Sequence, residues 1–89
     1  MSTAMLGGEL ETMATLKGKL NEQANTVATL TSTVDQQVKN TVWSGPAADR
    51  FRELWDGQFK QTLEQLRIAL NDAATEVNNR AEAIRVATA

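Results

Sequence analysis

Few side chains in this 89-residue chain could carry out chemistry. It has no histidine, cysteine or tyrosine, which removes the commonest general base, a thiolate metal ligand and a frequent proton donor. The best remaining pair of carboxylates is Glu53 and Asp56. A catalytic carboxylate needs burial or a like-charged neighbour in a pocket, whereas Arg50, Arg52 and Lys60 stand close by in the sequence. We therefore predict that the protein is not an enzyme and binds no cofactor or metal.

The charge balance and the apolar runs exclude two further classes. Nine basic and eleven acidic residues are interleaved and give a net charge of −2, without the basic stripe of a nucleic-acid binder. No apolar run approaches the roughly 20 residues that cross a bilayer, so we predict no membrane insertion. The start of the chain, residues 1–8, resembles no signal peptide. These features predict a soluble cytoplasmic protein, unless it is exported by a route that needs no cleaved signal.

Two long segments repeat apolar residues every three or four positions, which is the spacing of one face of an α-helix. The first series is Leu6, Leu10, Met13, Leu16, Leu20, Ala24, Val27, Leu30, Val34 and Val38. The second is Ala47, Phe51, Trp55, Phe59, Leu63, Leu66, Leu70, Ala73, Val77, Ala81 and Ile84. They predict helices over about residues 8–41 and 46–86. A start of the first helix at residue 2 or 3 is the alternative, at a cost of about 2 kcal/mol for two helical glycines.

The break between the segments has the composition of a tight turn. Pro46 suits the first turn of a helix, and Gly45 or Ser44 can cap that helix. Asp49 adds negative charge near its positive end. A short turn between two long helices makes them antiparallel. The fold class is therefore all-α, a single helical-hairpin domain over residues 1–89.

Two helices cannot cover apolar stripes of this width, so we expect a partner. A second hairpin would close the stripes into a four-helix bundle. The aromatic run Phe51, Trp55 and Phe59 is either plain core or an anchor at that interface. Trp43, at the tip, either plugs the core or recognises a further protein. The predicted core and dimer interface comprises Leu16, Leu20, Val27, Leu30, Val34, Phe51, Trp55, Phe59, Leu63, Leu66, Leu70 and Val77.

The turn Trp43-Ser44-Gly45, placed between two helical segments in a chain of this length, resembles the WXG hundred-residue family of early-secreted-antigen-like proteins. The resemblance covers essentially the whole chain. It implies helical hairpins that pair antiparallel into homodimeric or heterodimeric four-helix bundles. It also implies export without a cleaved signal by a type VII secretion system, whose membrane-associated ATPase recognises the dimer. Trp43, Ser44 and Gly45 would form the turn of the secretion motif.

One feature departs from the family. Many secreted pairs carry a C-terminal Tyr-X-X-X-Asp/Glu signal on one member, and this chain has no tyrosine. Either the chain is the member of a heterodimer that lacks the signal, or it forms a homodimer that uses another determinant or is not exported. We favour the heterodimer. The alternative function is that of an intracellular helical adaptor or chaperone-like subunit.

Overall fold

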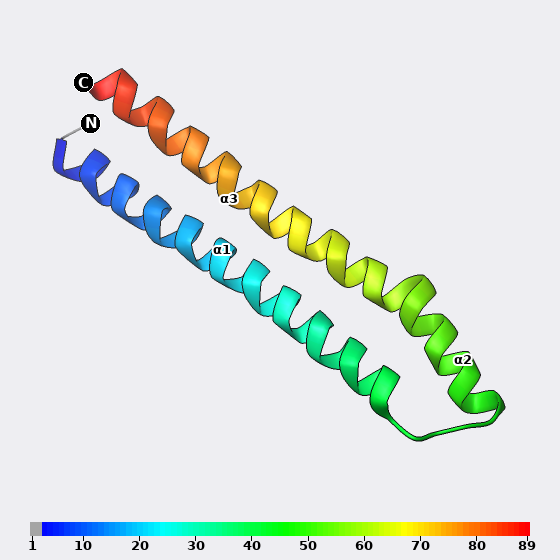
Figure 1. Ribbon diagram of the computed structural model, residues 1–89. Coiled ribbons are helices and arrows are strands. Elements are labelled where there is room, and N and C mark those ends of the chain that lie inside the picture. Colours follow the sequence, from blue (N-terminus) through cyan, green and yellow to red (C-terminus); the bar gives the residue numbers. More distant parts are fainter. Residues whose placement is uncertain (1–2) are drawn as a thin grey trace.

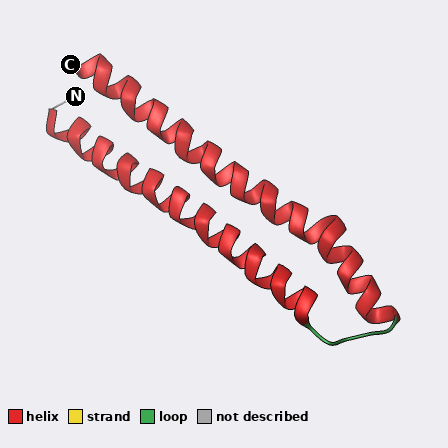
Figure 2. Ribbon diagram, in the orientation of Figure 1, coloured by secondary structure: helices red, strands yellow, loops and turns green. Residues whose placement is uncertain are grey.

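The computed structural model describes residues 3–89, with side chains from Gly7 onward, and it is a helical hairpin as predicted. The first helix, α1, spans Thr3–Asn40, and the second consists of α2 (Pro46–Leu54), the π turn η1 (Trp55–Phe59) and α3 (Lys60–Thr88) (Figure 1). The two helices run antiparallel over their length, and the described residues contain no strand (Figure 2). The hairpin measures 66 × 16 × 14 Å. Residues 1 and 2 of the predicted domain and the side chain of Leu6 lie outside this description.

Helix α1 begins at Thr3 rather than near residue 8, which is the alternative start. Gly7 and Gly8 therefore lie inside the helix, where they are exposed and a β-carbon would meet nothing within 4 Å. A helical glycine costs about 1 kcal/mol but keeps its backbone hydrogen bonds, so it weakens a helix without ending it. The helix ends at Asn40, and the amide of Thr41 still donates to the carbonyl of Gln37 at 3.0 Å.

The two helices contact each other along a seam of buried and half-buried residues. The seam comprises Leu10, Met13, Lys17, Leu20, Ala24, Val27, Thr31, Val34 and Val38 on α1, and Lys60, Leu63, Arg67, Leu70, Ala74, Val77, Ala81 and Ile84 on α3. These residues repeat every seven positions, as in left-handed helix pairs. The most buried are the alanines Ala24, Ala74 and Ala81, with at most 9% of their surface exposed. The large apolar residues of the seam, such as Leu20 and Leu70, are only half-buried.

The second helix runs from Pro46 to Thr88 without a break, but it contains a π turn that the prediction lacked. If the second helix were a regular α-helix before Lys60, its spacing would place the acidic residues Asp56 and Glu53 on the side that faces α1. The π turn contains one extra residue, and the positions that lie inward are instead Trp55 and Ala48, which are 4% and 0% exposed. The extra residue thus removes carboxylates from the helix interface and replaces them with apolar groups.

Candidate functional site

The turn at the tip of the hairpin depends on one glycine. Gly45 has φ 112° and ψ 174°, a backbone conformation that residues with a β-carbon rarely adopt. It is the N-cap of α2, and Pro46 follows as the first helical residue. The amide of Asp49 donates to the carbonyl of Gly45 at 3.1 Å, and no side chain caps the helix, so the predicted alternative cap at Ser44 is not used. The local sequence therefore fixes a sharp return of the chain directly after Trp43.

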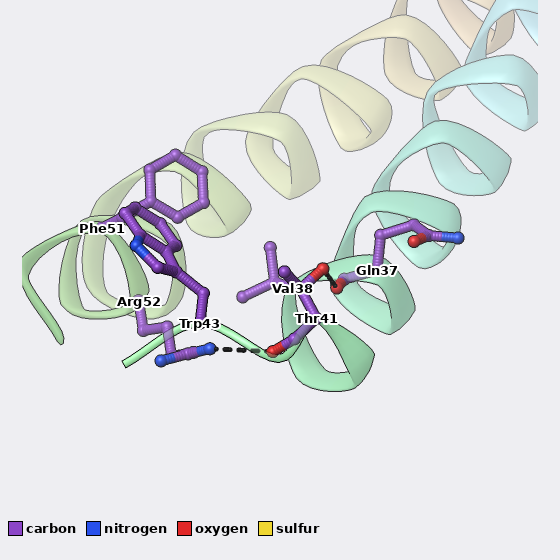
Figure 3. Close-up of a pocket in the computed structure, with 6 residues that line it drawn as sticks. All are labelled: Gln37, Val38, Thr41, Trp43, Phe51 and Arg52. Atoms are coloured by element: carbon purple, nitrogen blue, oxygen red, sulfur yellow. Dashed lines mark hydrogen bonds between the residues drawn. The ribbon is translucent and has the colours of Figure 1, made fainter. Parts of the chain in front are cut away.

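Around this turn the structure forms an apolar cleft of about 210 Å³, which we call the turn cup. Its lining residues are Gln37, Val38, Thr41, Trp43, Phe51 and Arg52 (Figure 3). The rings of Trp43 and Phe51 are tilted against each other, with centroids 6.2 Å apart. Arg52 Nη2 donates to the carbonyl oxygen of Thr41 at 3.2 Å, which joins α2 to the end of α1 (Figure 3). A basic group at this position also suits the negative end of the α1 dipole.

The residues of the turn remain accessible although they contact each other. Trp43 is 46% exposed and Phe51 is 39% exposed, and the neighbouring Val42 is fully exposed. Trp43 therefore does not plug the end of the core. Exposed aromatic side chains beside a small apolar cleft are typical of a surface that another protein contacts.

Asp35 of α1 accepts hydrogen bonds from three donors, of which Trp55 and Lys60 join it to the second helix and Lys39 lies on α1 itself. Its Oδ1 accepts from Trp55 Nε1 at 3.0 Å and from Lys60 Nζ at 3.0 Å, and its Oδ2 accepts from Lys39 Nζ at 2.8 Å. Trp55 and Lys60 are five residues apart, and the π turn brings both onto the side of the helix that faces Asp35. We call Asp35, Lys39, Trp55 and Lys60 the Asp35 clamp.

The clamp favours the ionised form of Asp35. Its hydrogen bond with Lys39, followed by those with Trp55 and Lys60, holds the pKa of the Asp35 carboxyl well below its usual range. The same contact raises the pKa of Lys39. The side chain of Asp35 is only 16% exposed, and its bonds with Trp55 and Lys60 form between the two helices, whereas its bond with Lys39 lies on the exposed surface of α1.

One long side of the hairpin is largely apolar, although Glu9, Gln23, Gln37 and Arg80 lie on the same side. Leu16 and Leu30 on α1 immediately precede seam residues, and so do Phe59 and Leu66 on the second helix. Equivalent positions of two antiparallel helices lie on the same side of the pair, so these four side chains share one face. Their exposed fractions lie between 42% and 48%. With half-buried seam residues on that side, the apolar face comprises Met13, Leu16, Leu20, Val27, Leu30, Val34, Phe59, Leu63, Leu66, Leu70, Val77 and Ile84.

The opposite side of the seam is polar and its groups bond to each other. Lys17 Nζ donates to Asn78 Oδ1 at 3.0 Å, a contact between α1 and α3. Arg67 on the same side donates to Glu64 at 2.5 and 3.1 Å. We call this the clamp face; it comprises Lys17, Asp35, Trp55, Lys60, Glu64, Arg67 and Asn78.

The predicted interface residues divide between these places. All except Phe51 and Trp55 lie on the apolar face. Phe51 lines the turn cup, and Trp55 is buried on the clamp face against Asp35. The aromatic run of Phe51, Trp55 and Phe59 is therefore not one stripe, because the π turn between Trp55 and Phe59 shifts Phe59 onto another side of the helix.

Residues 3–89 contain no group of three potential metal ligands, and Glu53 and Asp56 are both exposed. Among the described residues, no helix combines the length and apolar character of a membrane span. The arrangement can bind through its apolar cleft and face.

Sequence reasoning did not identify Asp35, Val38 or Arg52 as parts of the site. Asp35 lies between Val34 and Val38 of the apolar series, and an acid so close to a buried stripe is a signal that it has a partner. The other available signal is the shift in spacing between Ala48, Trp55 and the series that starts at Leu63.

The comparison with protein families gives one match. The model for WXG100, described as proteins of 100 residues with WXG, matches residues 8–87. The match includes α2, the π turn and most of α1 and α3, with Trp43, Ser44 and Gly45 at its centre. The comparisons with curated proteins and with solved structures each give no match.

Proposed function

Since the chain belongs to the WXG100 family, the family of early-secreted-antigen-like substrates of type VII secretion, we propose that it is exported by such a system as a folded dimer. It leaves the cytoplasm without a cleaved signal peptide and acts by binding proteins, not by catalysis. The apolar face is its dimer interface, and the turn cup is the surface that the membrane-associated secretion ATPase recognises.

The surface area supports a dimer. The hairpin has 6509 Å² of accessible surface, whereas a compact monomer of this mass is expected to have about 5,100 Å². The excess of about 1,400 Å² exceeds the roughly 800 Å² that each partner buries in a standard interface. A second hairpin on the apolar face would cover Leu16, Leu30 and Leu66, each close to half exposed in the single chain.

The partner is either a second copy of the chain or a paralogous hairpin. In an antiparallel bundle, the tail of the partner lies beside the turn of this chain. This chain lacks the tyrosine of the Tyr-X-X-X-Asp/Glu signal. A paralogue that carries the signal would place it beside Trp43, which favours the heterodimer.

A single observation carries the export role: the family turn residue Trp43 is 46% exposed and lines an apolar cleft with Phe51. Within the single hairpin the Trp43 side chain stays accessible. Its accessible ring can be recognised without unfolding the hairpin.

The test is to replace Trp43 and follow export. Trp43→Ala removes one side of the turn cup but leaves the seam intact, so we expect the secreted fraction to fall while the helical content stays unchanged. Ile68→Ala is the matched control, because Ile68 is equally exposed (45%) and lies on α3 away from the turn. Cell and culture fractions are compared by immunoblot in strains with and without the secretion ATPase.

Two results separate the possibilities. An unaltered secreted yield of Trp43→Ala would remove the turn cup from recognition. If the wild-type protein stays inside the cell whether or not the ATPase is present, the intracellular adaptor becomes the better explanation.

A further inference from the structure

The turn cup is lined by residues from α1, from the loop that follows it and from α2. Gln37 and Val38 lie at the end of α1, Thr41 and Trp43 lie in the loop, and Phe51 and Arg52 lie on α2. Its shape therefore depends on how α2 is held relative to the end of α1. The part of the second helix that connects α2 to the long seam is the π turn.

The second helix changes direction between α3 and α2, and the π turn lies at the bend (Figure 1). Sharp bends in helices occur at π turns because the extra residue interrupts the regular hydrogen-bond ladder. The bend brings α2 over the end of α1, where Arg52 reaches the carbonyl of Thr41 at 3.2 Å. The π turn thus lies where it can set the position of Phe51.

The bend is fastened to α1 at one level of the hairpin. Asp35 accepts from Trp55, the first residue of the π turn, and from Lys60, the first residue after it. Both bonds end on the same oxygen atom, so the two limits of the π turn are held against one point of α1. Val38, which lines the turn cup, lies three residues further along α1.

We infer that the π turn, fastened by Asp35, is the positioning element that bends α2 over the end of α1 and so gives the turn cup its shape. Asp35 is a positioning residue, since it does not line the turn cup itself. The link to export rests on the proposed function, whereas the link to the shape of the cleft does not.

Deletion of Gly57 tests the bend directly. Removing one residue from the π turn leaves an uninterrupted α-helix in which Trp55 and Lys60 become four residues apart and still share a face. The same side of α2 then still faces α1 and the Asp35 clamp is retained, and only the bend between α2 and α3 is lost. Gly57→Ala is the matched control, because it keeps the residue count and its β-carbon would meet nothing within 4 Å.

Nuclear magnetic resonance gives separate readings of the clamp and the cleft. The chain has two tryptophans, so Trp55 and Trp43 give two indole N–H signals. In the deletion variant we expect the Trp55 indole to keep its protection from solvent exchange, while cross-peaks between the rings of Phe51 and Trp43, whose centroids lie 6.2 Å apart, disappear. Gly57→Ala should keep both. Retained cross-peaks in the deletion variant would overturn the inference.

Asp35→Ala is a second test of the inference, and its result does not depend on how the deletion variant folds. It should abolish the protection of the Trp55 indole and the cross-peaks between the rings of Phe51 and Trp43. Asp72→Asn, an exposed acid on α3, is the control and should change neither. If Asp35→Ala leaves the cross-peaks intact, Asp35 does not position the turn cup.

Export is then measured on the same variants. The deletion and Asp35→Ala should both lose secreted yield, whereas Gly57→Ala and Asp72→Asn should not. Altered cross-peaks with normal export would contradict the proposed role of the turn cup in export but leave the inference on its shape intact. Unaltered cross-peaks would overturn the inference at any level of export.

Discussion

The apolar face and the clamp face of the hairpin are built by the same two helices on either side of one seam. On the clamp face, the polar groups find partners inside the chain, as in the bonds of Asp35 to Trp55 and Lys60 and of Lys17 to Asn78. On the apolar face, leucines such as Leu30 and Leu66 remain close to half exposed. The polar groups of the clamp face therefore have partners within one chain, whereas the leucines of the apolar face have no surface in the chain to pack against.

The two faces differ because different residues flank the alanines at the centre of the seam. Because the buried centre is made of Ala24, Ala74 and Ala81, most of the large apolar side chains lie beside it rather than within it. A hairpin of this kind buries little apolar area on its own and is expected to be marginally stable alone. The clamp face then specifies how the two helices align, whereas in the proposed dimer the apolar face would supply the free energy of association.

The largest expected effect is on association. We predict that Leu30→Asp abolishes dimerisation, because the dimer would bury an unpaired charge at the centre of the apolar face. Ala28→Asp introduces the same side chain two positions away, at an exposed site that helical spacing places beside the clamp face. Sedimentation should therefore show a monomer for Leu30→Asp and a dimer for Ala28→Asp. If both variants remain dimers, the apolar face is not the dimer interface.

The next effect is on the stability of the clamp face. Trp55 is 4% exposed, and its replacement by alanine should lower the free energy of unfolding by about 3–5 kcal/mol. Trp55→Phe keeps most of the buried ring but loses the bond to Asp35, so its cost should be smaller. Urea unfolding at one fixed protein concentration measures both, since dimerisation contributes to the apparent stability. Equal costs for the two variants would show that the indole N–H matters more than the buried ring.

The sequence was sufficient to predict the helices, the turn and most of the apolar face. Those features depend on a repeat of three or four residues that persists over many turns, and a persistent period is a strong signal. The proline and glycine of the turn act locally, so Gly45 and Pro46 indicate the break without knowledge of the rest of the chain.

The π turn could not be predicted in the same way. Ala47 and Ala48 are adjacent, so the series that leads to Trp55 can begin at either of them. The first choice gives an uninterrupted helix with a continuous aromatic stripe, and the structure adopts the second. The contact that accompanies it, from Asp35 to Trp55 and Lys60, joins residues that are distant in the sequence. From spacing alone, Lys60 would pair with Asp56 or Glu64 on its own helix.

The stability of the clamp face should depend on pH, because Asp35 is ionised there. The folded state depresses the pKa of Asp35, so its contribution to stability is present above the unfolded value of about 3.9 and is lost as the pH falls below it. We therefore predict that the thermal midpoint of the wild type falls more between pH 5 and pH 2 than that of Asp35→Asn. Glu64, whose pKa is also lowered by Arg67, titrates in both proteins and cancels in the comparison. Equal acid sensitivity of the two proteins would contradict the role of the ionised carboxylate.

The smallest effect should come from Lys17→Met. Lys17 lies in the seam and donates to Asn78 at 3.0 Å. Methionine preserves the apolar stem that packs between the helices, so only a part-exposed hydrogen bond is lost, at a cost of about 0.5–1.5 kcal/mol. The substitution also makes one position of the clamp face apolar without creating a continuous patch.

For Lys17→Met we accordingly expect a slightly lower urea midpoint and an unchanged mass by sedimentation. If Lys17→Met forms larger assemblies instead, the polar groups of the clamp face are needed to prevent association on that side. Their hydrogen bonds within the chain would then not be the whole reason why that face stays free of partners.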